Sequence, residues 1–576
     1  MEFIILRQRR REEKKGMLKV LLVGINSKYI HSNLAIRYLK AFTRELDYEA
    51  VLKEYTINDR IENILQDIIL SKPDIVAFSC YIWNIDYVSK ITELIKRVDK
   101  SIEIVYGGPE VSYDSFETMR INKADYVIEG EGEETYREFI LYKLGKMSIS
   151  EIRGIYYREN EDILYKGGRS LMDIESVVFP YEENENMLNK IVYYEASRGC
   201  PFNCKYCLSS TVHGVRFLNV ERVKKELAFL IKSGVKLIKF VDRTFNCNHE
   251  FAMSIWKYLI EQDTETCFHF EISADLLKEK EIALLAKAPK GRFQFEVGVQ
   301  TTNDKVLKNI NRYVNFQDIK DKVIELEKIK NIKQHLDLIA GLPGEDFDSF
   351  KNSFNELYSI GPEEIQLGFL KLLKGSSMRE EAEKWGMEYS PYPPYEILKS
   401  NTMSYNELLE LKKAEAMVDK YYNSGKFNNI INFLINKFAA PFDFYMTLGN
   451  YFYEKGYFAR SISNTEYYKV FKDFHEKFFE GYAAATAMED IIKYDYLRFN
   501  KKRGVPDILR KSITKEEEYK LKRKMQEIIN FNDVYVDKFN IDIPKFIKSG
   551  EINFTPSYII FDLRNEDNII DTIYSI

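Results

Sequence analysis

Cysteine is scarce in this sequence, and long apolar runs are absent from it. Six of the 576 residues are cysteine, and their spacing is not that of a secreted disulfide framework. No apolar run reaches the roughly 18 residues that a membrane-spanning helix needs. The N-terminus also lacks the order of a secretory signal, because its charges follow its short apolar run. We therefore expect a cytoplasmic protein outside the membrane, whose clustered cysteines bind metal or take part in chemistry.

A strong charge of one sign is missing as well. The 84 lysine and arginine residues nearly balance the 89 aspartate and glutamate residues, which leaves a net charge of −5. This balance argues against a protein that coats nucleic acid, although it allows a local basic patch. With 45% hydrophobic and 30% charged residues, the composition indicates a globular chain. Its length suggests about three to five domains.

The N-terminal part is predicted to alternate between strands and helices. We expect residues 1–16 to be a disordered extension, since a clean strand pattern opens at Met17. Strand-like Val- and Ile-rich runs then alternate with amphipathic stretches up to residue 150. Such alternation predicts an α/β domain over 17–150 with a doubly wound parallel sheet, as in flavodoxin or a Rossmann fold. Ligands of these sheets bind outside the carboxyl ends of the strands.

A second alternating part follows a linker. Residues 151–185 are expected to form this linker, with a short hairpin in it. Residues 186–400 contain six β/α units, which predict a partial (β/α)6 barrel of the TIM type, because a full barrel has eight. From 401 to 576 the chain is predicted to be mostly α-helical, and its first long helix opens with a capping box from Ser404 to Glu407. The predicted barrel strands are 191–197, 237–242, 267–273, 293–300, 333–341 and 363–370.

Half of the cysteines lie together at the start of the predicted barrel. Cys200, Cys204 and Cys207 form a C-x3-C-x2-C pattern in a loop that directly follows a strand. A closed structural zinc site would need a fourth ligand, which His213 could supply. Unligated core cysteines are a second interpretation. The third is a 4Fe–4S cluster with three thiolate ligands, in which one iron keeps an open coordination position for a substrate or cofactor.

The segment RGCPFNCKYC (198–207) resembles the signature of the radical S-adenosylmethionine (radical SAM) enzymes. The resemblance implies that the open iron chelates the amino and carboxylate groups of S-adenosylmethionine (SAM). One electron from the cluster would then cleave its sulfonium, and the 5′-deoxyadenosyl radical that forms would abstract a substrate hydrogen. Tyr206 matches the aromatic position that packs near the adenine in the family.

Three further segments resemble SAM-binding motifs of the family: FVDRTFN (240–246), GVQTTNDKVLKNINR (298–312) and LDLIAGLPGED (336–346). Asp242, in the first, either binds the amino group of SAM or caps a turn, because the family's usual Gly-Gly-Glu is absent there. The resemblance places Gln300 and Asp337 at the ribose. Arg312 either meets the methionine carboxylate, as the resemblance implies, or is a solvated charge at a helix. The turn that begins at Gly341 would approach the adenine with its backbone.

The domain in front of the barrel resembles the cobalamin-binding domain of one large branch of this family. The segments VYGGPEVS (105–112) and DYVIEGEGEETYREF (125–139) carry the likeness. Gly107 and Gly108 would let backbone approach the corrin or its nucleotide tail, and Ser79 would offer a hydroxyl to that tail. His31 is either a lower axial ligand of cobalt or a polar loop residue near a corrin without a protein ligand, and we favour the second.

The sequence is thus identified as a member of the cobalamin-binding radical SAM family with a C-terminal helical domain. The cofactors implied are a 4Fe–4S cluster, SAM and cobalamin, and the favoured reaction is methyl transfer to an unactivated centre, with cyclisation as another product of the same chemistry. A tRNA-modifying enzyme like the methylthiotransferases and a non-enzymatic corrinoid- or cluster-binding sensor are the alternatives. Expected partners are a small-molecule or macromolecular substrate and an electron donor of the flavodoxin or ferredoxin type, but not nucleic acid.

Overall fold

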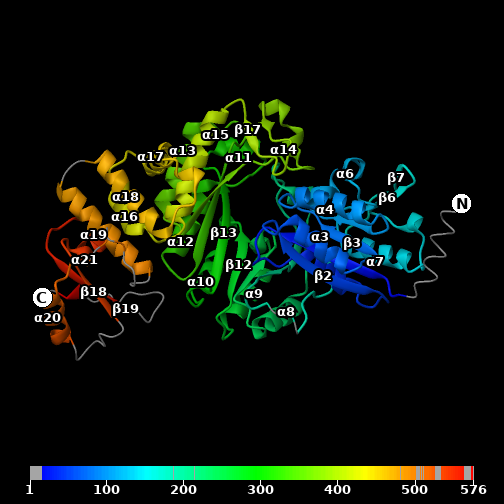
Figure 1. Ribbon diagram of the computed structural model, residues 1–576, viewed down its shortest axis with the longest axis horizontal. Helices are drawn as coiled ribbons and strands as arrows, with labels where there is room; N and C mark the ends of the chain where they lie inside the picture. The colour runs from blue at the N-terminus through cyan, green and yellow to red at the C-terminus, as the bar shows by residue number, and fades with distance from the viewer. Residues whose placement is uncertain are drawn as a thin grey trace. The chain divides into compact units, whose positions relative to one another are not determined.

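The computed structural model (Figure 1) describes residues 16–183, 185, 187–212, 214–479, 482–500, 506, 509, 511–525, 534–562 and 573–574. The predicted N-terminal extension, residue 16 excepted, lies outside these residues. The chain divides into two units. The first comprises residues 1–334, 341–344 and 369–402, and the second comprises 335–340, 345–368 and 403–576.

The N-terminal domain is built on a seven-stranded sheet with the order β2-β1-β3-β4-β5-β6-β7. Its first five strands run parallel, whereas β6 and β7 form an antiparallel hairpin at one edge. The order of the parallel strands is that of a flavodoxin-like doubly wound sheet, so the predicted fold is confirmed. The hairpin comes from residues predicted as a linker. The strands are β1 Lys19–Asn26, β2 Glu49–Thr56, β3 Ile75–Ser79, β4 Glu103–Gly107, β5 Tyr126–Ile128, β6 Ile155–Glu159 and β7 Asp162–Tyr165.

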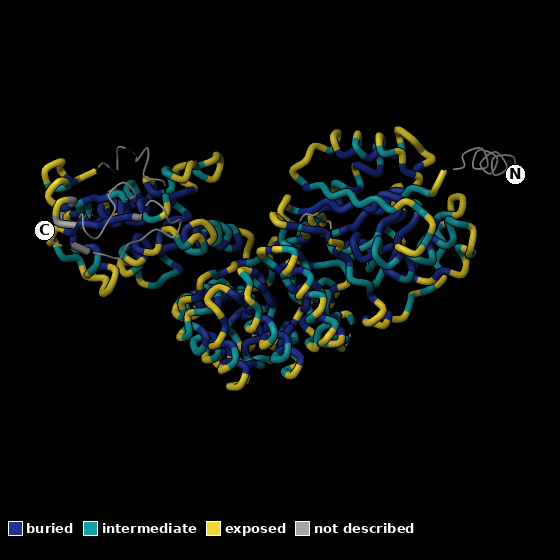
Figure 2. The backbone as a smooth tube through the Cα atoms, turned by 90° about the horizontal axis from the view of Figure 1, so that it is seen from below, coloured by how far each residue is buried: buried dark blue, intermediate teal, exposed yellow. Residues whose placement is uncertain are grey.

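Helices cover both faces of this sheet. Helices α3 (Ile61–Leu70) and α4 (Ile85–Val98) pack on one face, and α2 (Leu34–Phe42) and α7 (Gly132–Lys143) pack on the other. Strand β1 therefore sends alternate apolar side chains into two separate cores, and Figure 2 shows buried strands inside this domain, whereas the edge strand β2 is mostly half-buried. Burial on both faces explains why the strands read as continuous apolar runs.

The barrel is a six-stranded sheet with the order β15-β14-β13-β12-β11-β8. The first residue of each strand lies within one or two residues of the predicted start. The predicted partial barrel of six strands is confirmed. The strands are β8 Ile191–Tyr194, β11 Leu237–Phe240, β12 Cys267–Ile272, β13 Phe293–Gln300, β14 Lys333–Ala340 and β15 Glu364–Phe369. The helices between them are α8 Val220–Lys232, α9 His249–Ile260, α10 Glu279–Leu285, α11 Asp304–Asn309, α12 Phe316–Glu327 and α13 Phe347–Ile360.

The two faces of the barrel strands differ in polarity. On one face, Phe240, Phe270 and Phe295 from three neighbouring strands are buried with Trp256 of α9. The alternate positions of the same strands carry polar groups, because successive side chains of a strand point to opposite sides. This polar row consists of Tyr193, Lys239, His269, Glu271 and Glu296.

The second unit is mostly helical after residue 403, as predicted. The capping box from Ser404 to Glu407 is present at the start of α15 (Tyr405–Met417). The core is aromatic; the ring centres of Tyr421 and Phe471, for example, lie 4.5 Å apart. The other elements are α16 Asn428–Ile435, α17 Pro441–Glu454, α18 Asn464–Phe478, α19 Tyr482–Phe499, α20 Lys515–Met525, α21 Ile543–Ser549 and the strands β18 Val534–Phe539, β19 Ser557–Asp562 and β20 Ile573–Tyr574. Within the described residues, no helix is both long and apolar enough to cross a lipid bilayer.

Candidate functional site

The three clustered cysteines belong to the loop of a β-hairpin that the sequence did not reveal. Strand β9 (Ser197–Cys200) ends at the first cysteine and pairs antiparallel with β10 (Gly214–Phe217). The backbone of Gly199 has φ +104°, and a Cβ there would lie 2.1 Å from the carbonyl oxygen of Gly214. Only glycine therefore permits this close pairing just before Cys200. His213, the fourth ligand in the zinc interpretation, lies outside the described residues.

The segment that follows α11 holds the cysteine loop in place. Lys205 donates its backbone N–H to the carbonyl of Ile310 at 3.0 Å, and the Asn311 side chain donates to the carbonyl of Asn203 at 3.0 Å. The next residue, Arg312, thereby brings its guanidinium to 3.8 Å from the Cys204 sulfur. Burial raises the pKa of the Cys204 thiol, and the Arg312 cation opposes that rise. A fixed cation beside the sulfur favours the thiolate that binds metal.

These residues fit a 4Fe–4S cluster. Three thiols come from one short loop, two of them half-buried and Cys204 buried, and thiolates are the usual ligands of such clusters. Among the described residues, no three His, Cys, Asp or Glu side chains lie close enough together to hold a metal ion, so the assignment of the cysteines to a cluster rests on the chemistry of their thiols. We therefore retain the cluster as the interpretation of Cys200, Cys204 and Cys207.

Two residues predicted to bind SAM meet beside the cysteine loop. Arg312 donates through Nη2 to the carbonyl of Gly298 at 2.6 Å. The side chain of Gln300 lies over the same glycine, since a Cβ on Gly298 would fall 2.2 Å from its Nε2. In the part of the chain that the structure describes, the buried Arg312 Nε has no hydrogen-bond partner. A buried donor left over in this way fits an anionic ligand group such as a carboxylate.

The remaining SAM candidates differ in their surroundings. Tyr206 interacts with Cys204 and Arg312, which places it in the cysteine loop cluster. Gly341 has φ +86°, and a Cβ there would lie 2.8 Å from Ile397, so close packing already requires glycine. Asp337 lies on β14, in the second unit, on the same strand face as His335.

Asp242 makes hydrogen bonds inside the protein. One carboxylate oxygen accepts from the Ala196 N–H at 3.0 Å and the other accepts from the Ser197 hydroxyl at 2.5 Å. The residue is only 1% exposed, and burial raises the pKa of its carboxyl to about 7. Of the two roles that the sequence left open, these contacts favour the structural one, because both oxygens join β11 to the start of β9.

A cavity of about 610 Å³ lies between the sheet domain and the cysteine hairpin, both in the first unit. Residues of the sheet domain lining it include Asn26, Ser27, His31–Ala35, Tyr38, Tyr81, Trp83 and Gly130–Glu133. Residues of the barrel part lining it are Tyr193, Glu195, Ser197–Gly199, Ser209, Val212, Arg216, Val241 and Arg243. The sheet contributes its carboxyl edge, where this fold binds ligands. The cavity therefore lies between this edge, with His31 in its wall, and the hairpin that carries the cysteines.

His31 lies in this cavity wall and contacts the barrel. Its Nδ1 is 2.7 Å from the hydroxyl of Tyr193. The flanking residues run along the free edge of β8: the carbonyl of Ile30 accepts from Ile191 N at 2.7 Å, and the Ser32 hydroxyl donates to Ile191 O at 2.9 Å. Burial lowers the pKa of His31, and nearby lysines lower it further, so the imidazole is neutral near pH 7. These contacts give the residue a docking role in addition to any role at the corrin.

The other three cobalamin candidates shape the carboxyl edge of the sheet but do not line this cavity. The Ser79 hydroxyl accepts a hydrogen bond of 2.9 Å from the Asn33 side chain. Gly108 has φ +115°, and a Cβ there would lie 2.6 Å from the carbonyl of Cys80. Gly107 ends β4 and pairs with Ser79 in the register of the sheet. Ser79, Gly107 and Gly108 stay predictions as cobalamin contacts.

An ionic network in the cavity wall was missed by the sequence reasoning. Arg198 of β9 reaches Glu133 at 2.5 Å, Glu195 at 2.9 Å and Glu131 at 3.7 Å. Arg216 of β10 also pairs with Glu131. The acidic start of α7 in EGEGEETYREF was visible in the sequence, but nothing local indicated that its partners lie on the cysteine hairpin.

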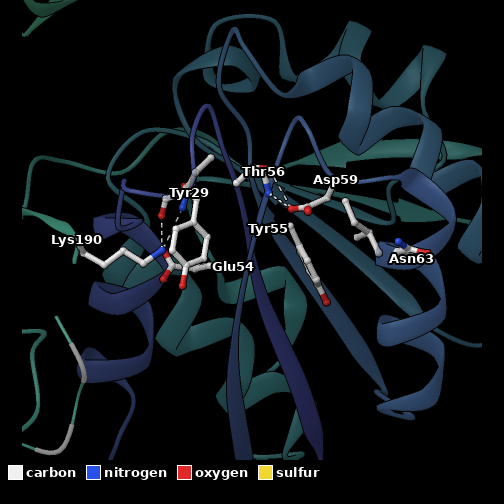
Figure 3. A pocket seen from close by; sticks show the side chains of 9 residues that line it. Tyr29, Glu54, Tyr55, Thr56, Asp59, Asn63 and Lys190 are labelled. Carbon is white, nitrogen blue, oxygen red and sulfur yellow. Dashed lines mark hydrogen bonds between the residues drawn. The ribbon is translucent and has the colours of Figure 1, made fainter. Parts of the chain in front are cut away.

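A smaller pocket of about 280 Å³ adjoins the edge strand β2 (Figure 3). Lys190 lies over the ring of Tyr29, 3.8 Å from its centre, and donates to the carbonyl of the same residue. Asp59 accepts from the backbone N–H of Thr56 at 2.7 Å and from its hydroxyl at 3.1 Å. These charged groups are thus bonded within the protein, and Lys190 and Tyr29 extend the contact of the His31 loop with the barrel.

Comparison with protein-family models assigns three parts of the chain. Residues 20–140 match the B12 binding domain, and residues 194–357 match the radical SAM superfamily. Residues 383–561 match a family described as a protein of unknown function, DUF4080. The first two matches cover the sheet domain and most of the barrel, including the cysteine loop.

Known proteins agree with this assignment. The chain is 27% identical over 312 residues to the uncharacterized methyltransferase PH0819 of Pyrococcus horikoshii, covering 51% of this chain and 66% of the relative. It is 24% identical to the cobalamin-dependent radical SAM methyltransferase TokK of Streptomyces tokunonensis, covering 56% and 51%. The solved methyltransferase TsrM of Kitasatospora setae, with cobalamin and a 4Fe–4S cluster bound, shares the fold at a TM-score of 0.55 and 16% identity over 66% of this chain and 82% of that one.

The chain spans only half to two thirds of the length of the curated relatives that it matches. The assignment therefore rests on the domains rather than on any one relative. The order of domains along the chain, the open three-cysteine loop and the cavity at the carboxyl edge of the sheet all agree with it. The chain is a radical SAM protein with a B12-binding domain before its barrel and a DUF4080 domain after it, and these domains imply a 4Fe–4S cluster, SAM and cobalamin as its cofactors.

Proposed function

We propose that this chain is a cobalamin-dependent radical SAM methyltransferase that methylates an unactivated centre of its substrate. The observation that carries the proposal is the cavity lined jointly by the carboxyl edge of the B12-binding domain and by the cysteine hairpin. When bound, the cofactors would supply a 5′-deoxyadenosyl radical and a transferable methyl group. A substrate in this cavity would be within reach of both.

The chain's own residues would hold and enclose the reactants. Cys200, Cys204 and Cys207 would ligate the cluster, with the Arg312 cation beside Cys204. Gln300 and Arg312 would bind polar groups of SAM from their shared position over Gly298. We also propose that Tyr206, Asp337 and Gly341 contact SAM, as the resemblance implies.

Each of the two alternatives disagrees with one part of the chain. A methylthiotransferase needs cysteines that the N-terminal domain lacks, and a sensor would make no use of the barrel. The methylthiotransferases carry cluster cysteines of their own in front of the barrel, whereas residues 17–190 contain only Cys80. That thiol is buried and directed to the carbonyl of Phe78 at 3.6 Å. A sensor would not require SAM-binding residues in the barrel.

We further propose that the protein works in the cytoplasm and receives its electron from a flavodoxin or ferredoxin, because radical SAM chemistry needs a reductant.

The proposal is tested by anaerobic purification with iron and cobalamin supplied. Iron, sulfide, zinc and cobalt would be measured in the wild type, in Cys204→Ala and in the matched control Cys267→Ala, whose cysteine lies in β12. We expect about four irons and one corrinoid per chain, with iron lost only in Cys204→Ala. Added reductant and SAM should then yield 5′-deoxyadenosine.

Three results would contradict parts of the proposal. Iron without corrinoid would keep radical chemistry and exclude methyl transfer from cobalamin. Both cofactors without cleavage of SAM would favour the sensor. Zinc without iron, even after reconstitution, would make the cysteine loop a structural zinc site.

A further inference from the structure

One segment of the first unit contacts three separate parts of the candidate site. Residues 370–401 follow the last barrel strand and fold back on themselves. The backbone N–H of Leu372 donates to the carbonyl of Tyr395 at 2.9 Å, and β16 (Glu388–Tyr389) pairs antiparallel with β17 (Ile397–Lys399). We call residues 370–401 the strap. The match to DUF4080 begins inside it.

The strap is bonded to the cysteine loop. Lys205 directly follows Cys204, and its backbone carbonyl accepts from the N–H of Met378 at 2.9 Å. The side chain of Lys205 pairs with Glu381 of the strap, with Nζ 2.7 Å from Oε1. Since the Lys205 N–H is already bonded to the carbonyl of Ile310, both backbone groups of this residue are held. The strap therefore helps to fix the loop on which the cluster would be bound.

The strap also packs on the turn that begins at Gly341, a proposed contact of SAM. A Cβ on Gly341 would lie 2.8 Å from the side chain of Ile397. A Cβ on Gly344, at the end of this turn, would lie 3.9 Å from the ring of Trp385. The indole N–H of Trp385 donates to Glu381 at 3.2 Å. The residues that hold the cysteine loop and those that contact the turn thus belong to one bonded segment.

A third contact joins the strap to the sheet domain. Glu110 of α5 (Pro109–Ser112) is buried, and its carboxylate accepts from the hydroxyl of Tyr395. Lys374 Nζ lies 3.5 Å from the same carboxylate. The Arg379 guanidinium lies over the ring of Tyr395, 4.9 Å from its centre. Because a buried carboxylate that loses its partners is costly, these bonds favour one arrangement of the strap on the sheet domain.

Tyr395 has an unusual backbone conformation. Its φ is +57°, in a region that bulky residues rarely adopt unless the surrounding structure holds them there. Two hydrogen bonds within the strap do so: the Tyr395 N–H donates to the carbonyl of Tyr392 at 2.8 Å, and the Leu372 N–H donates to the Tyr395 carbonyl at 2.9 Å. Ile397, which packs on Gly341, is only two residues further along the chain. A short, bonded piece of chain thus joins the sheet domain to the turn.

We propose that the strap sets the distance between the two cofactor sites, and that Tyr395 is the positioning residue that fixes it to the sheet domain. Through Glu110, the strap would hold the B12-binding domain in place beside the loop of the three cysteines. The inference rests on the proposed function insofar as both cofactors must bind, but it concerns their separation and not turnover. It also gives the first residues of the DUF4080 match a role at the site.

The test is electron paramagnetic resonance on the full chain, reconstituted anaerobically with cluster and cobalamin. The corrinoid is kept as cobalt(II), and its spin relaxation is recorded with the cluster oxidised and with the cluster reduced. A reduced cluster nearby is paramagnetic and speeds this relaxation, and the effect falls steeply with distance. The variants are Tyr395→Phe and Glu110→Gln, which remove the hydroxyl and the charge of the contact. Tyr558→Phe is the matched control, because it removes a Tyr–Glu hydrogen bond of 3.1 Å in the second unit.

We expect the reduced cluster to speed relaxation in the wild type and in the control. Both test variants should keep iron and corrinoid but lose at least half of this effect, and Tyr395→Phe decides if Glu110→Gln does not fold. An effect as large as that of the wild type would overturn the proposal. Loss of corrinoid from Tyr395→Phe would overturn it as well, because the contact would then belong to the corrin site itself.

The wild type separates failure of this inference from failure of the proposed function. A wild type that binds both cofactors but shows no effect of the reduced cluster would overturn the inference alone. A wild type that binds no corrinoid would overturn the proposed function, and the inference with it.

Discussion

Single buried charges decide much of the chemistry of this protein. Asp242, a candidate SAM contact from its sequence motif, bonds Ala196 and Ser197 instead. Arg312, at the end of the segment 298–312, lies against Cys204, and its buried Nε has no hydrogen-bond partner among the described residues. For both residues, the hydrogen bonds already made inside the chain determine which donors and acceptors are available to a ligand.

Asp242 should make stability depend on pH. Its carboxyl keeps its proton to about pH 7 in the folded chain, whereas an unfolded aspartate loses its proton near pH 4. Between these values the folded state binds more protons, so stability falls as pH rises, by up to about 1.4 kcal/mol per pH unit. Melting temperatures measured from pH 5 to 8 should fall with pH in the wild type and change less in Asp242→Asn. Parallel curves would contradict this.

Arg312 should matter for SAM more than for iron. Replacing it with glutamine removes the charge beside Cys204 and the buried donor, and a charge-assisted hydrogen bond contributes about 1.5–3 kcal/mol. The dissociation constant of SAM should therefore rise by about 10- to 150-fold, while iron content stays near that of the wild type. Arg222→Gln serves as the control, because it removes a guanidinium on α8 that is bonded to Glu226 at 2.8 Å. Equal SAM affinity in Arg312→Gln and wild type would remove this residue from the site.

At the scale of elements, the contact between the His31 loop and β8 is a feature that periodicity does not reveal. The strands themselves were predictable, because each is an apolar run of the right length. The β9–β10 hairpin was not, because its glycines and cysteines show no period. His31 and Tyr193 are 162 residues apart in sequence, so their hydrogen bond follows only from the packed fold.

This loop bears on the state of cobalt. The contact of Nδ1 with Tyr193 does not occupy Nε2 of His31, but residues 30 and 32 on either side are bonded to β8, so we expect His31 to dock the loop rather than to ligate the metal. The electron paramagnetic resonance spectrum of the protein-bound cobalt(II) corrinoid should then be the same in wild type and His31→Ala. A nitrogen splitting that is present in the wild type and lost in the variant would instead make His31 an axial ligand.

For the whole molecule, features that depend on local sequence pattern could be predicted, whereas features that depend on contacts between distant residues could not. The doubly wound sheet, the six-stranded barrel and the helical C-terminal part could be predicted, because they depend on local pattern. The cavity could not, since Arg198 pairs with Glu133 across 65 residues of sequence. The predicted domain boundaries at 150, 185 and 400 stay predictions, although β6 and β7 add residues 155–165 to the N-terminal sheet.

The Arg198 network should stabilise the first unit as a whole. Removing this guanidinium leaves the buried Glu133 and the half-buried Glu195 without their cation, which costs about 3–5 kcal/mol. The free energy of unfolding of Arg198→Gln, measured in denaturant, should fall by that amount, and corrinoid binding should weaken. Arg120→Gln, in an exposed pair with Glu117, should leave the free energy of unfolding nearly unchanged. Similar losses in both variants would contradict the role of the network.

The contact of residues 30–32 with β8 predicts how the barrel behaves when it is expressed without the N-terminal domain. A barrel of six strands does not close on itself, and β8 would be an open edge if nothing lay along it. An uncovered edge offers unpaired N–H and C=O groups to other chains. Expressed without the B12-binding domain, the barrel should therefore self-associate and precipitate, even though every strand of its own sheet is present.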